Sequence, residues 1–557
     1  MTRKDRIVGF LAGAALVAVA TNAAAVGRAD DSHSSARRVE DNAPYHVMVE
    51  PEVVIGIVKP VNGVGQPPMI GALKNWPMMH YLKEAGIPYS RLHDVGGRLG
   101  GGLFVDIPNL FPDFDADEND PKNYRFVFTD SLMKALETNG VEPFFRLGVT
   151  IENWVEYPGK FPALRTKPPK DFAKWGRICE HVIRHYTEGW ANGFKMKVEY
   201  WEIWNEPEGK AMFDAPFGEY MRLYGTVAPY LKKKFPHLKI GGYGSCGFYA
   251  GVDAEFVAAA AVSPDMKRFV DCARQFLSAA QKNGWPLDFF SYHSYSAPRE
   301  ALRQVRYADR LLDEFGFTRD KTKRVFDEWL PFPALESLGS AHQASAIAAE
   351  LIGLQNGPCD IACIYDARCG VGLFSPLFNP LTQKPHKAYW SFVAFNELRK
   401  RGTAVRVNVR DGDGRADCPQ SAERRVKDNA PYQDVNAPDQ DVVDAKTLKP
   451  SIYVAAARGA DGSVAVMIAN PGSKEKSFVL DAGARRTSCI RCRIIDEKRT
   501  WKEIPFPTAL PPHSVLFIEC YIKNISCFSC PLWLKNTSCF SCPLWLKTDE
   551  GRINLRI

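Results

Sequence analysis

Beyond residue 25, the sequence lacks any apolar run long enough to cross a bilayer. It also contains no long block of Lys and Arg: 71 basic and 64 acidic residues leave a net charge of only +7. This small excess argues against nucleic acid as a partner. The apolar content of 45% and the charged content of 24% are ordinary for a globular protein. A chain of 557 residues can therefore bury a large core and still have room for a second domain.

The apolar run that is present lies at the N-terminus. A basic start, MTRKDR, precedes the short run Ile7–Ala20, and Ala23–Ala25 offers a small-residue cleavage site. The pattern predicts a signal peptide over residues 1–25, with an uncleaved anchor as the alternative. We therefore expect a secreted or periplasmic protein without stable membrane insertion, in which residues 26–50 form an N-terminal segment.

Metal-binding motifs are incomplete. The acidic stretch DFDADEND (113–120) is similar to a calcium loop, but Glu118 stands where such a loop needs Gly. Two CxxC pairs repeat in NISCFSCPLWLK (524–535) and NTSCFSCPLWLK (536–547), and no His accompanies them. A short duplication is therefore favoured over a zinc site, and residues 523–557 are interpreted as a repetitive Cys-containing tail. The six cysteines between residues 179 and 369 are expected to be buried thiols. We expect no metal and no organic cofactor.

From Val53 to about Arg401, short β-prone runs alternate with longer segments of helical spacing. The predicted strands begin at Glu52, Ile87, Val141, Val198, Leu238, Leu287, Lys323 and Asp360. Eight such alternations predict an α/β fold, a (β/α)8 TIM barrel over residues 51–401. The alternative is an open doubly wound sheet, which usually carries a GxGxxG loop after its first strand; the glycines of Val61–Pro68 lack that spacing.

After Arg401 the composition and the hydrophobic pattern change. Residues 411–449 are polar and rich in Asp and Pro, which is typical of a linker or a long loop. Short β-prone runs with turn signals between them follow. They predict a small C-terminal antiparallel β-sandwich, so that residues 402–522 form an accessory domain.

Two carboxylates stand at the ends of predicted strands. Glu206 follows the apolar run VEYWEIWN, and Glu328 follows KRVFD. In a barrel, the carboxyl ends of the strands and the loops after them form the active face. Strands four and seven lie on opposite sides of the mouth, so the two carboxylates could face each other, as a retaining glycoside hydrolase requires.

These motifs resemble glycoside hydrolase family 39, the β-xylosidases and α-L-iduronidases, within the clan of (β/α)8 glycosidases that use two glutamates. The resemblance rests on SRLHD (90–94), ETNGVEPFFRLG (137–148), WNEPE (204–208), DFFSYHSY (288–295), DEW (327–329) and KPHKAYWSFVAFNEL (384–398). It covers roughly Val53 to Leu398. The chain departs from the family at Asp327, where a Thr or Ser commonly precedes the nucleophile, and at Glu208, where Asn is usual.

The resemblance implies a catalytic pair and a double-displacement mechanism. Glu206 would be the acid/base and Glu328 the nucleophile that forms a covalent glycosyl-enzyme. Asn205 would hold the sugar 2-hydroxyl, although a turn-forming role is the alternative. The substrate would be a glycoside or oligosaccharide of xylose-type units, cleaved at its end.

Further side chains are candidates for substrate contacts, and for each of them ordinary packing is the alternative. Arg91 and His93 lie two residues apart on one strand, so both could face the interior; Arg91 could keep Glu328 ionised, and His93 could bind a hydroxyl. His293 and Tyr295 end another strand in the same way, and Tyr295 could donate to the nucleophile. Trp329 could stack on a sugar ring.

Two other functions stay open. An α-L-iduronidase-like or arabinosidase-like activity could use the same two glutamates. A carbohydrate-binding protein without turnover is the alternative outside enzymes, although it would have no need to keep both Glu206 and Glu328.

Overall fold

The computed structural model describes residues 44–68, 78–95, 105–149, 166–210, 212–252, 264–331, 333–370, 372–410, 452–482 and 487–522. The predicted signal peptide, the polar stretch 411–449 and the Cys-containing tail lie outside these residues. None of the helices that are described has both the length and the apolar character needed to span a bilayer.

Eight parallel strands close into a barrel, which confirms the predicted fold class. In order around the barrel they are β2 (Gly63–Gly65), β3 (Tyr89–Leu92), β4 (Glu142–Leu147), β5 (Tyr200–Ile203), β6 (Lys239–Ser245), β7 (Phe289–Ser294), β8 (Lys323–Trp329) and β9 (Ile361–Ile364). Sequential strands are neighbours throughout, and β9 pairs with β2 to close the ring. The open doubly wound alternative is therefore wrong.

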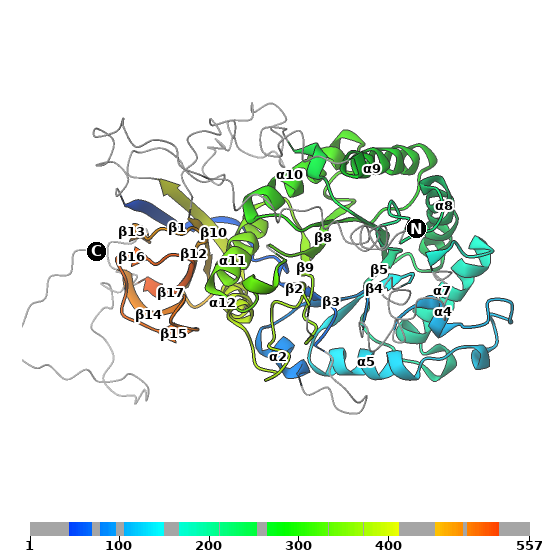
Figure 1. Cartoon of the computed structure of the whole chain (residues 1–557), viewed down its shortest axis with the longest axis horizontal. Coiled ribbons are helices and arrows are strands. Elements are labelled where there is room, and N and C mark those ends of the chain that lie inside the picture. The colour runs from blue at the N-terminus through cyan, green and yellow to red at the C-terminus, as the bar shows by residue number, and fades with distance from the viewer. Residues whose placement is uncertain are drawn as a thin grey trace, which may run out of the picture.

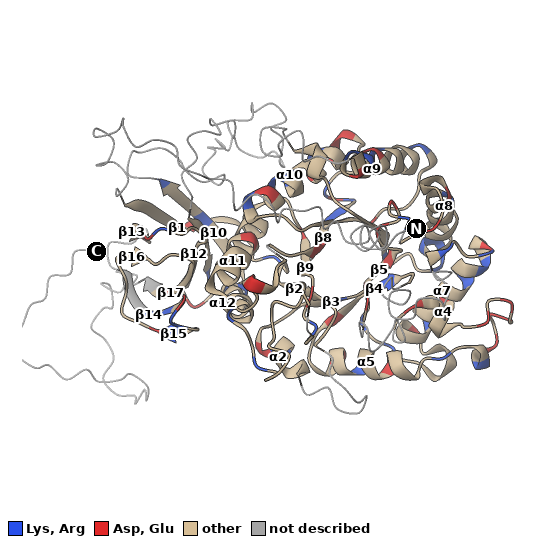
Figure 2. Ribbon diagram, viewed as in Figure 1, with Lys and Arg blue, Asp and Glu red and all other residues tan. Residues whose placement is uncertain are grey.

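Helices surround the barrel in Figure 1. They are α2 (Met79–Glu84), α4 (Ile107–Leu110), α5 (Val127–Thr138), α7 (Phe172–Thr187), α8 (Phe217–Lys234), α9 (Pro264–Asn283), α10 (Pro298–Glu314), α11 (Ala341–Asn356) and α12 (Lys387–Arg401). Several of these helices are amphipathic; α10, for example, buries Ala301, Val305, Ala308 and Leu312 at helical spacing. Lys and Arg are interspersed with Asp and Glu along the outer helices in Figure 2.

The barrel interior is built in layers, because alternate residues of each strand point inward. The lowest layer is an apolar cluster of Tyr89, Phe144, Tyr200, Phe289, Val325 and Ile361. Two residues further along the same strands, the inward positions change to polar side chains. Those positions are Arg91 on β3, Arg146 on β4, Glu202 on β5, Ser291 on β7 and Asp327 on β8.

A second sheet lies beside the barrel, on the left in Figure 1. It has nine strands in the order β15 (Lys502–Glu503), β14 (Thr487–Ile495), β17 (Ser514–Ile522), β12 (Ser463–Asn470), β11 (Tyr453–Arg458), β10 (Thr403–Arg410), β1 (Tyr45–Ile57), β13 (Lys476–Asp481) and β16 (Ala509–Leu510). Its pairings are antiparallel except for β1 with β13. The predicted β-rich accessory domain is thus present, and it includes a strand from the N-terminal side of the barrel.

Strand β1 corrects the sequence prediction. Residues from Glu52 were expected to form the first barrel strand, but β1 pairs with β10 and β13 in the second sheet. The expected boundary between an N-terminal segment and the barrel at residue 50 cuts through this strand. A barrel strand must be buried on both faces, whereas Val54, Ile55 and Ile57 are exposed.

The first barrel strand is instead the short β2, in the glycine-rich stretch after β1. A Cβ atom on Gly63 would lie 2.7 Å from the carbonyl oxygen of Ala362 on β9. The glycine therefore permits the close approach that closes the ring.

The sheet packs against α11 and α12, which Figure 1 shows between it and the barrel. The buried positions on β11 and β12 that join the barrel core are four alanines and one methionine, namely Ala455, Ala457, Ala465, Ala469 and Met467. The opposite face carries the branched residues of a separate core, among them Val454, Val464, Val466 and Ile468. Because both faces of β12 are buried, its sequence is an almost continuous apolar run.

The placement of β1 predicts a large effect on stability for one valine of this strand and a small effect for another. Val49 is fully buried and Val54 is 53% exposed. In Val49→Asp a carboxylate enters the core of the second sheet, and we expect the free energy of unfolding to fall by about 3 kcal/mol or more. Val54→Asp should change it by no more than about 0.5 kcal/mol. Urea unfolding of both variants measures this, and a larger loss for Val54→Asp would contradict the placement of β1.

Candidate active site

Arg91 occupies the centre of the polar layer and is fully buried. Its Nε donates to Glu202 Oε2 at 2.9 Å and lies 2.9 Å from Asp327 Oδ2. Its Nη1 donates to Glu328 Oε2 at 3.0 Å, and its Nη2 donates to Asn205 Oδ1 at 2.6 Å. One guanidinium therefore joins side chains that come from β5, from the turn after β5 and from β8.

A β-bulge on β8 places two consecutive carboxylates near this guanidinium. Tyr292 pairs with Phe326 and His293 pairs with Glu328, so Asp327 is an extra residue relative to β7. The register with β9 shifts at the same place. In a regular strand, neighbouring side chains point to opposite faces. The bulge re-aims the chain, so that Asp327 and Glu328 both reach Arg91.

A strained turn after β5 positions the side chains of Asn205 and Glu206 in the WNEP motif. Trp204 and Glu206, on either side of Asn205, have positive φ angles of 73° and 45°. The Glu206 N–H donates to the carbonyl of Gly244 at 2.8 Å. A side chain on Gly244 would lie only 3.3 Å from Arg91 Nη2 and from Asn205 Oδ1, so the backbone of β6 can approach only as glycine. Backbone strain of this kind is frequent at functional sites.

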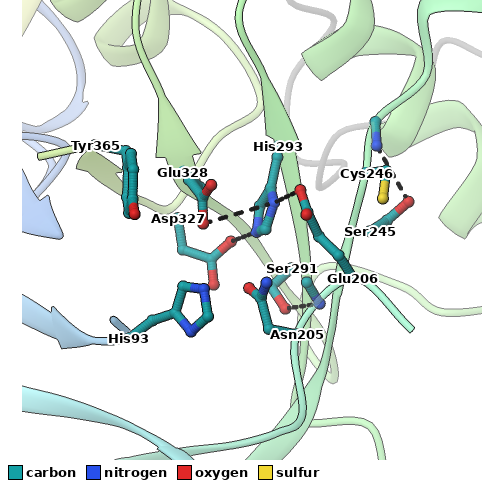
Figure 3. Close-up of polar contacts among 12 residues, drawn as sticks. His93, Asn205, Glu206, Ser245, Cys246, Ser291, His293, Asp327, Glu328 and Tyr365 are labelled. Atoms are coloured by element: carbon teal, nitrogen blue, oxygen red, sulfur yellow. Dashed lines mark hydrogen bonds and ion pairs between the residues drawn. The ribbon is translucent and has the colours of Figure 1, made fainter. Parts of the chain in front are cut away.

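His293 lies between the two glutamates (Figure 3). Its Nδ1 is 2.7 Å from Glu206 Oε1 and 3.8 Å from Glu328 Oε2. One nitrogen of His293 and one oxygen from each glutamate all lie within 4.8 Å of one another. Tyr295 donates from its hydroxyl to Glu328 Oε1. The two carboxylates predicted from distant parts of the sequence thus meet at the carboxyl ends of the strands.

Burial and neighbouring charges set the protonation of these groups. Burial raises the pKa of Glu206, although the hydrogen bond from His293 opposes this rise. Burial would lower the pKa of His293, but Glu328, Asp327 and Glu206 outweigh it and raise that pKa well above its ordinary value. Burial would raise the pKa of Asp327, but Arg91 and His293 hold it below the usual range. Burial raises the pKa of Glu202 to about 8.

As residue types, Glu206, His293 and Glu328 could also hold a metal ion. An imidazolium, however, has no free lone pair to offer to a metal. The raised pKa of His293 therefore favours an ion-paired set over a ligand set.

The remaining predicted residues have three different outcomes. The expected contacts of Arg91 and Tyr295 with Glu328 are confirmed. His93 Nδ1 accepts from Arg146 Nε at 3.1 Å, so its Nε2 carries the proton and lies 3.4 Å from Asp94 Oδ1. A contact between His93 and a sugar hydroxyl stays a prediction. The expectation that Trp329 stacks on a sugar is wrong, because its ring has no exposed surface and stacks on Phe326 inside the core.

Sequence reasoning missed two members of the polar layer, Glu202 and Ser291. Ser291 Oγ donates to Glu202 Oε1 at 2.6 Å and accepts from the Gly244 N–H. A signal existed for Glu202, since it is the one acidic residue in the strand YWEI, whose four residues are all buried. A buried carboxyl group needs hydrogen-bond partners, and Arg91 and Ser291 are those partners.

Comparison with known families agrees with this geometry. Residues 84–337 match the model of "Glycosyl hydrolases family 39". This match spans β3 to β8 of the barrel. Beta-xylosidases from Geobacillus stearothermophilus and Caldicellulosiruptor saccharolyticus are each 26% identical to this chain, over 251 and 259 residues. Those matches cover 42% and 45% of this chain. They cover 44% and 45% of the relatives, so the chain spans about half the length of the curated relatives it matches.

Solved structures share the fold of this chain. A glucosidase from Croceicoccus marinus superposes with a TM-score of 0.61 at 17% identity, over 86% of this chain and 100% of that one. A monomeric beta-xylosidase from Caulobacter crescentus gives a TM-score of 0.56 at 15% identity, over 86% and 99%. Both comparisons include the second sheet as well as the barrel, because the barrel alone is shorter than the matched length.

The central position of Arg91 predicts a large effect on stability. Arg91→Met removes the cation that faces Asp327 and Glu328 and the hydrogen-bond donor to Glu202, and the free energy of unfolding should fall by about 3–5 kcal/mol. Arg274→Met is the matched control, because Arg274 pairs with Glu314 on the surface and should contribute no more than about 1 kcal/mol. Guanidinium chloride unfolding at pH 7 compares the two. Equal losses would contradict a central role for Arg91.

Proposed function

We propose that the chain is a retaining glycoside hydrolase that removes terminal xylose-type units by double displacement. The observation that carries the proposal is the approach of Glu206 and Glu328, whose oxygens come within 4.8 Å. Retaining enzymes hold their carboxyl groups about 5–5.5 Å apart, whereas inverting enzymes need about 6.5–9.5 Å to admit a water molecule.

The environments of the two carboxyl groups suit two different roles. Burial raises the pKa of Glu206, which favours a protonated acid that can protonate the glycosidic oxygen. Glu328 receives hydrogen bonds from Arg91 and from Tyr295. Donors of this kind stabilise the carboxylate that attacks the anomeric carbon. In the second step Glu206, now ionised, takes a proton from the water that releases the sugar.

Asn205 offers a group for binding the substrate. Its Oδ1 is occupied by Arg91, which fixes the amide orientation. Its Nδ2 is buried, and no acceptor for it is found among the described residues. A buried donor without a partner is costly, and a sugar hydroxyl beside the reacting carbon would satisfy it. We assign Asn205 Nδ2 to the sugar 2-hydroxyl.

The substrate class rests on the curated relatives, both of which are named beta-xylosidases. An arabinosidase-like activity is the second candidate, since an alpha-L-arabinofuranosidase from Thermotoga maritima shares the fold with a TM-score of 0.54 at 14% identity. An iduronidase-like activity would use the same carboxylates. The basic N-terminal start and the apolar run that follows it support a secreted or periplasmic location.

A panel of nitrophenyl glycosides tests the proposal. We expect the β-xyloside to be cleaved fastest, with the α-L-arabinofuranoside and other sugars slower, and proton NMR of the first product should show retained configuration. Glu328→Ala should lose at least about 10³-fold in kcat, because no covalent intermediate can form. Glu188→Ala, at an exposed ion pair on the outer surface, is the control. Binding of xylo-oligosaccharides without hydrolysis of any sugar would favour a binding protein instead.

The role of Glu206 predicts the alkaline side of the pH profile. Glu206 must be protonated for the first step, and its pKa is raised. Activity should therefore persist above the ordinary carboxyl range and fall as the pH rises through that pKa. In Glu206→Gln this descent should disappear, and kcat/KM on xylobiose should drop by about 10²–10⁴-fold. A dinitrophenyl xyloside, whose leaving group needs no proton, should lose far less. Equal losses on both substrates would contradict the assignment.

A further inference from the structure

Asp327 is the extra residue of the β8 bulge. Neither of the two proposed catalytic steps uses its side chain. It is fully buried, lies beside Arg91, and its Oδ1 is 3.5 Å from His293 Nε2. His293 is also fully buried and presents its other nitrogen to Glu206. The imidazole therefore bridges Asp327 on one side and the acid/base carboxyl on the other, as Figure 3 shows.

The buried cluster contains two groups that can be positive and four that can be negative, so its charges balance when two of the four carboxyl groups are neutral. Arg91 and His293 can supply two positive charges. The carboxyl groups are four in number, those of Glu202, Glu206, Asp327 and Glu328. Burial raises the pKa of Glu202 and that of Glu206, whereas Arg91 and His293 lower that of Asp327 against the effect of burial. With the first two carboxyls neutral, Asp327 and Glu328 remain as two anions for the two cations.

This balance depends on Asp327. Without its charge, His293 would keep Glu328 as a nearby anion at 3.8 Å, but Nε2 would lose the one carboxylate that faces it. A neutral imidazole carries a single proton, on Nδ1 or on Nε2. The hydrogen bond from Nδ1 to Glu206 would then no longer be enforced.

We propose that Asp327 is a positioning residue that keeps His293 doubly protonated, so that the Nδ1–H is always directed at Glu206. This role rests on the proposed function for its catalytic consequence, but the protonation of His293 can be observed without any substrate. The positive imidazolium beside Glu206 limits how firmly that carboxyl holds its own proton. Asp327 therefore tunes the acid/base group through one intervening side chain.

Other charged or titratable groups face the two partners. His293 also faces His93, whose Nδ1 accepts a hydrogen bond from Arg146, and the nucleophile Glu328. Glu206 also faces Glu208, Glu328, Arg91, Cys246, Tyr249 and Tyr295. Among the described residues, none of these groups forms an ion pair or hydrogen bond with Nε2 of His293, whereas Asp327 lies 3.5 Å from it. Asp327 also faces Arg91, so the control variant must change that second contact alone.

The test follows the ring nitrogens of His293 by NMR in ¹⁵N-histidine-labelled protein, assigned with His293→Gln. In the wild type, both nitrogens should carry protons throughout pH 5–8. In Asp327→Asn, His293 should become neutral within that range, a shift of at least about one pH unit. The alkaline descent of kcat/KM should move upward in the same variant, because Glu206 loses its positive neighbour.

Glu202→Gln is the matched control. It also removes a buried carboxyl from Arg91, but Glu202 does not contact His293, so the protonation of His293 should stay as in the wild type. Asp327→Thr serves as a second neutral variant if the amide does not fold. A neutral His293 in the wild type at pH 7 would overturn the proposal, and so would an imidazolium that persists in Asp327→Asn or Asp327→Thr. If His293 behaves as expected but no glycoside is hydrolysed, the proposed function fails and the proton placement stands.

Discussion

The interior of this barrel depends on the guanidinium of Arg91. Two carboxylates on β8, one on β5 and the amide of Asn205 all converge on that one side chain. Each carboxylate would be costly to bury alone, and a planar cation with several fixed N–H groups can serve all of them at once. The position of the proposed nucleophile is therefore not an independent feature of β8. It is one branch of an ion cluster that also holds β3, β5 and β8 in register.

The layers of the barrel explain why such a cluster is tolerated. Below it, the aromatic rings of Tyr89, Phe144, Tyr200 and Phe289 close the barrel to water. Above it, Glu206 and Glu328 keep only 7% and 6% of their surface exposed. Electrostatic interactions are strong in such surroundings, so a small change in charge has a large effect on protonation. A site with four carboxyl groups and two cations can thereby keep one carboxyl neutral and another ionised a few ångströms apart.

Much of this could be predicted from the sequence, for physical reasons. The barrel follows from the alternation of strands and helices, and the pair Glu206 and Glu328 follows from its position at strand ends. The prediction failed for β1, because a run such as EVVIGIV is compatible with either sheet, and its partners lie far away in the chain. It also failed for Trp329. Strict alternation from Val325 would point Asp327 and Trp329 inward and turn Glu328 away. A bulge, which no local pattern reveals, lets Glu328 reach the interior as well.

The position of β1 has a consequence for biogenesis. This strand leaves the ribosome before any part of the barrel, yet its neighbours β10 and β13 begin at Thr403 and Lys476. For the whole time in which the barrel is synthesised, an extended segment with Val47, Val49, Val54 and Ile55 has no partner. Unpaired strands of this composition tend to aggregate. Completion of the second sheet must wait until nearly the whole polypeptide has emerged, which makes the earliest strand to be synthesised one of the last to find its place.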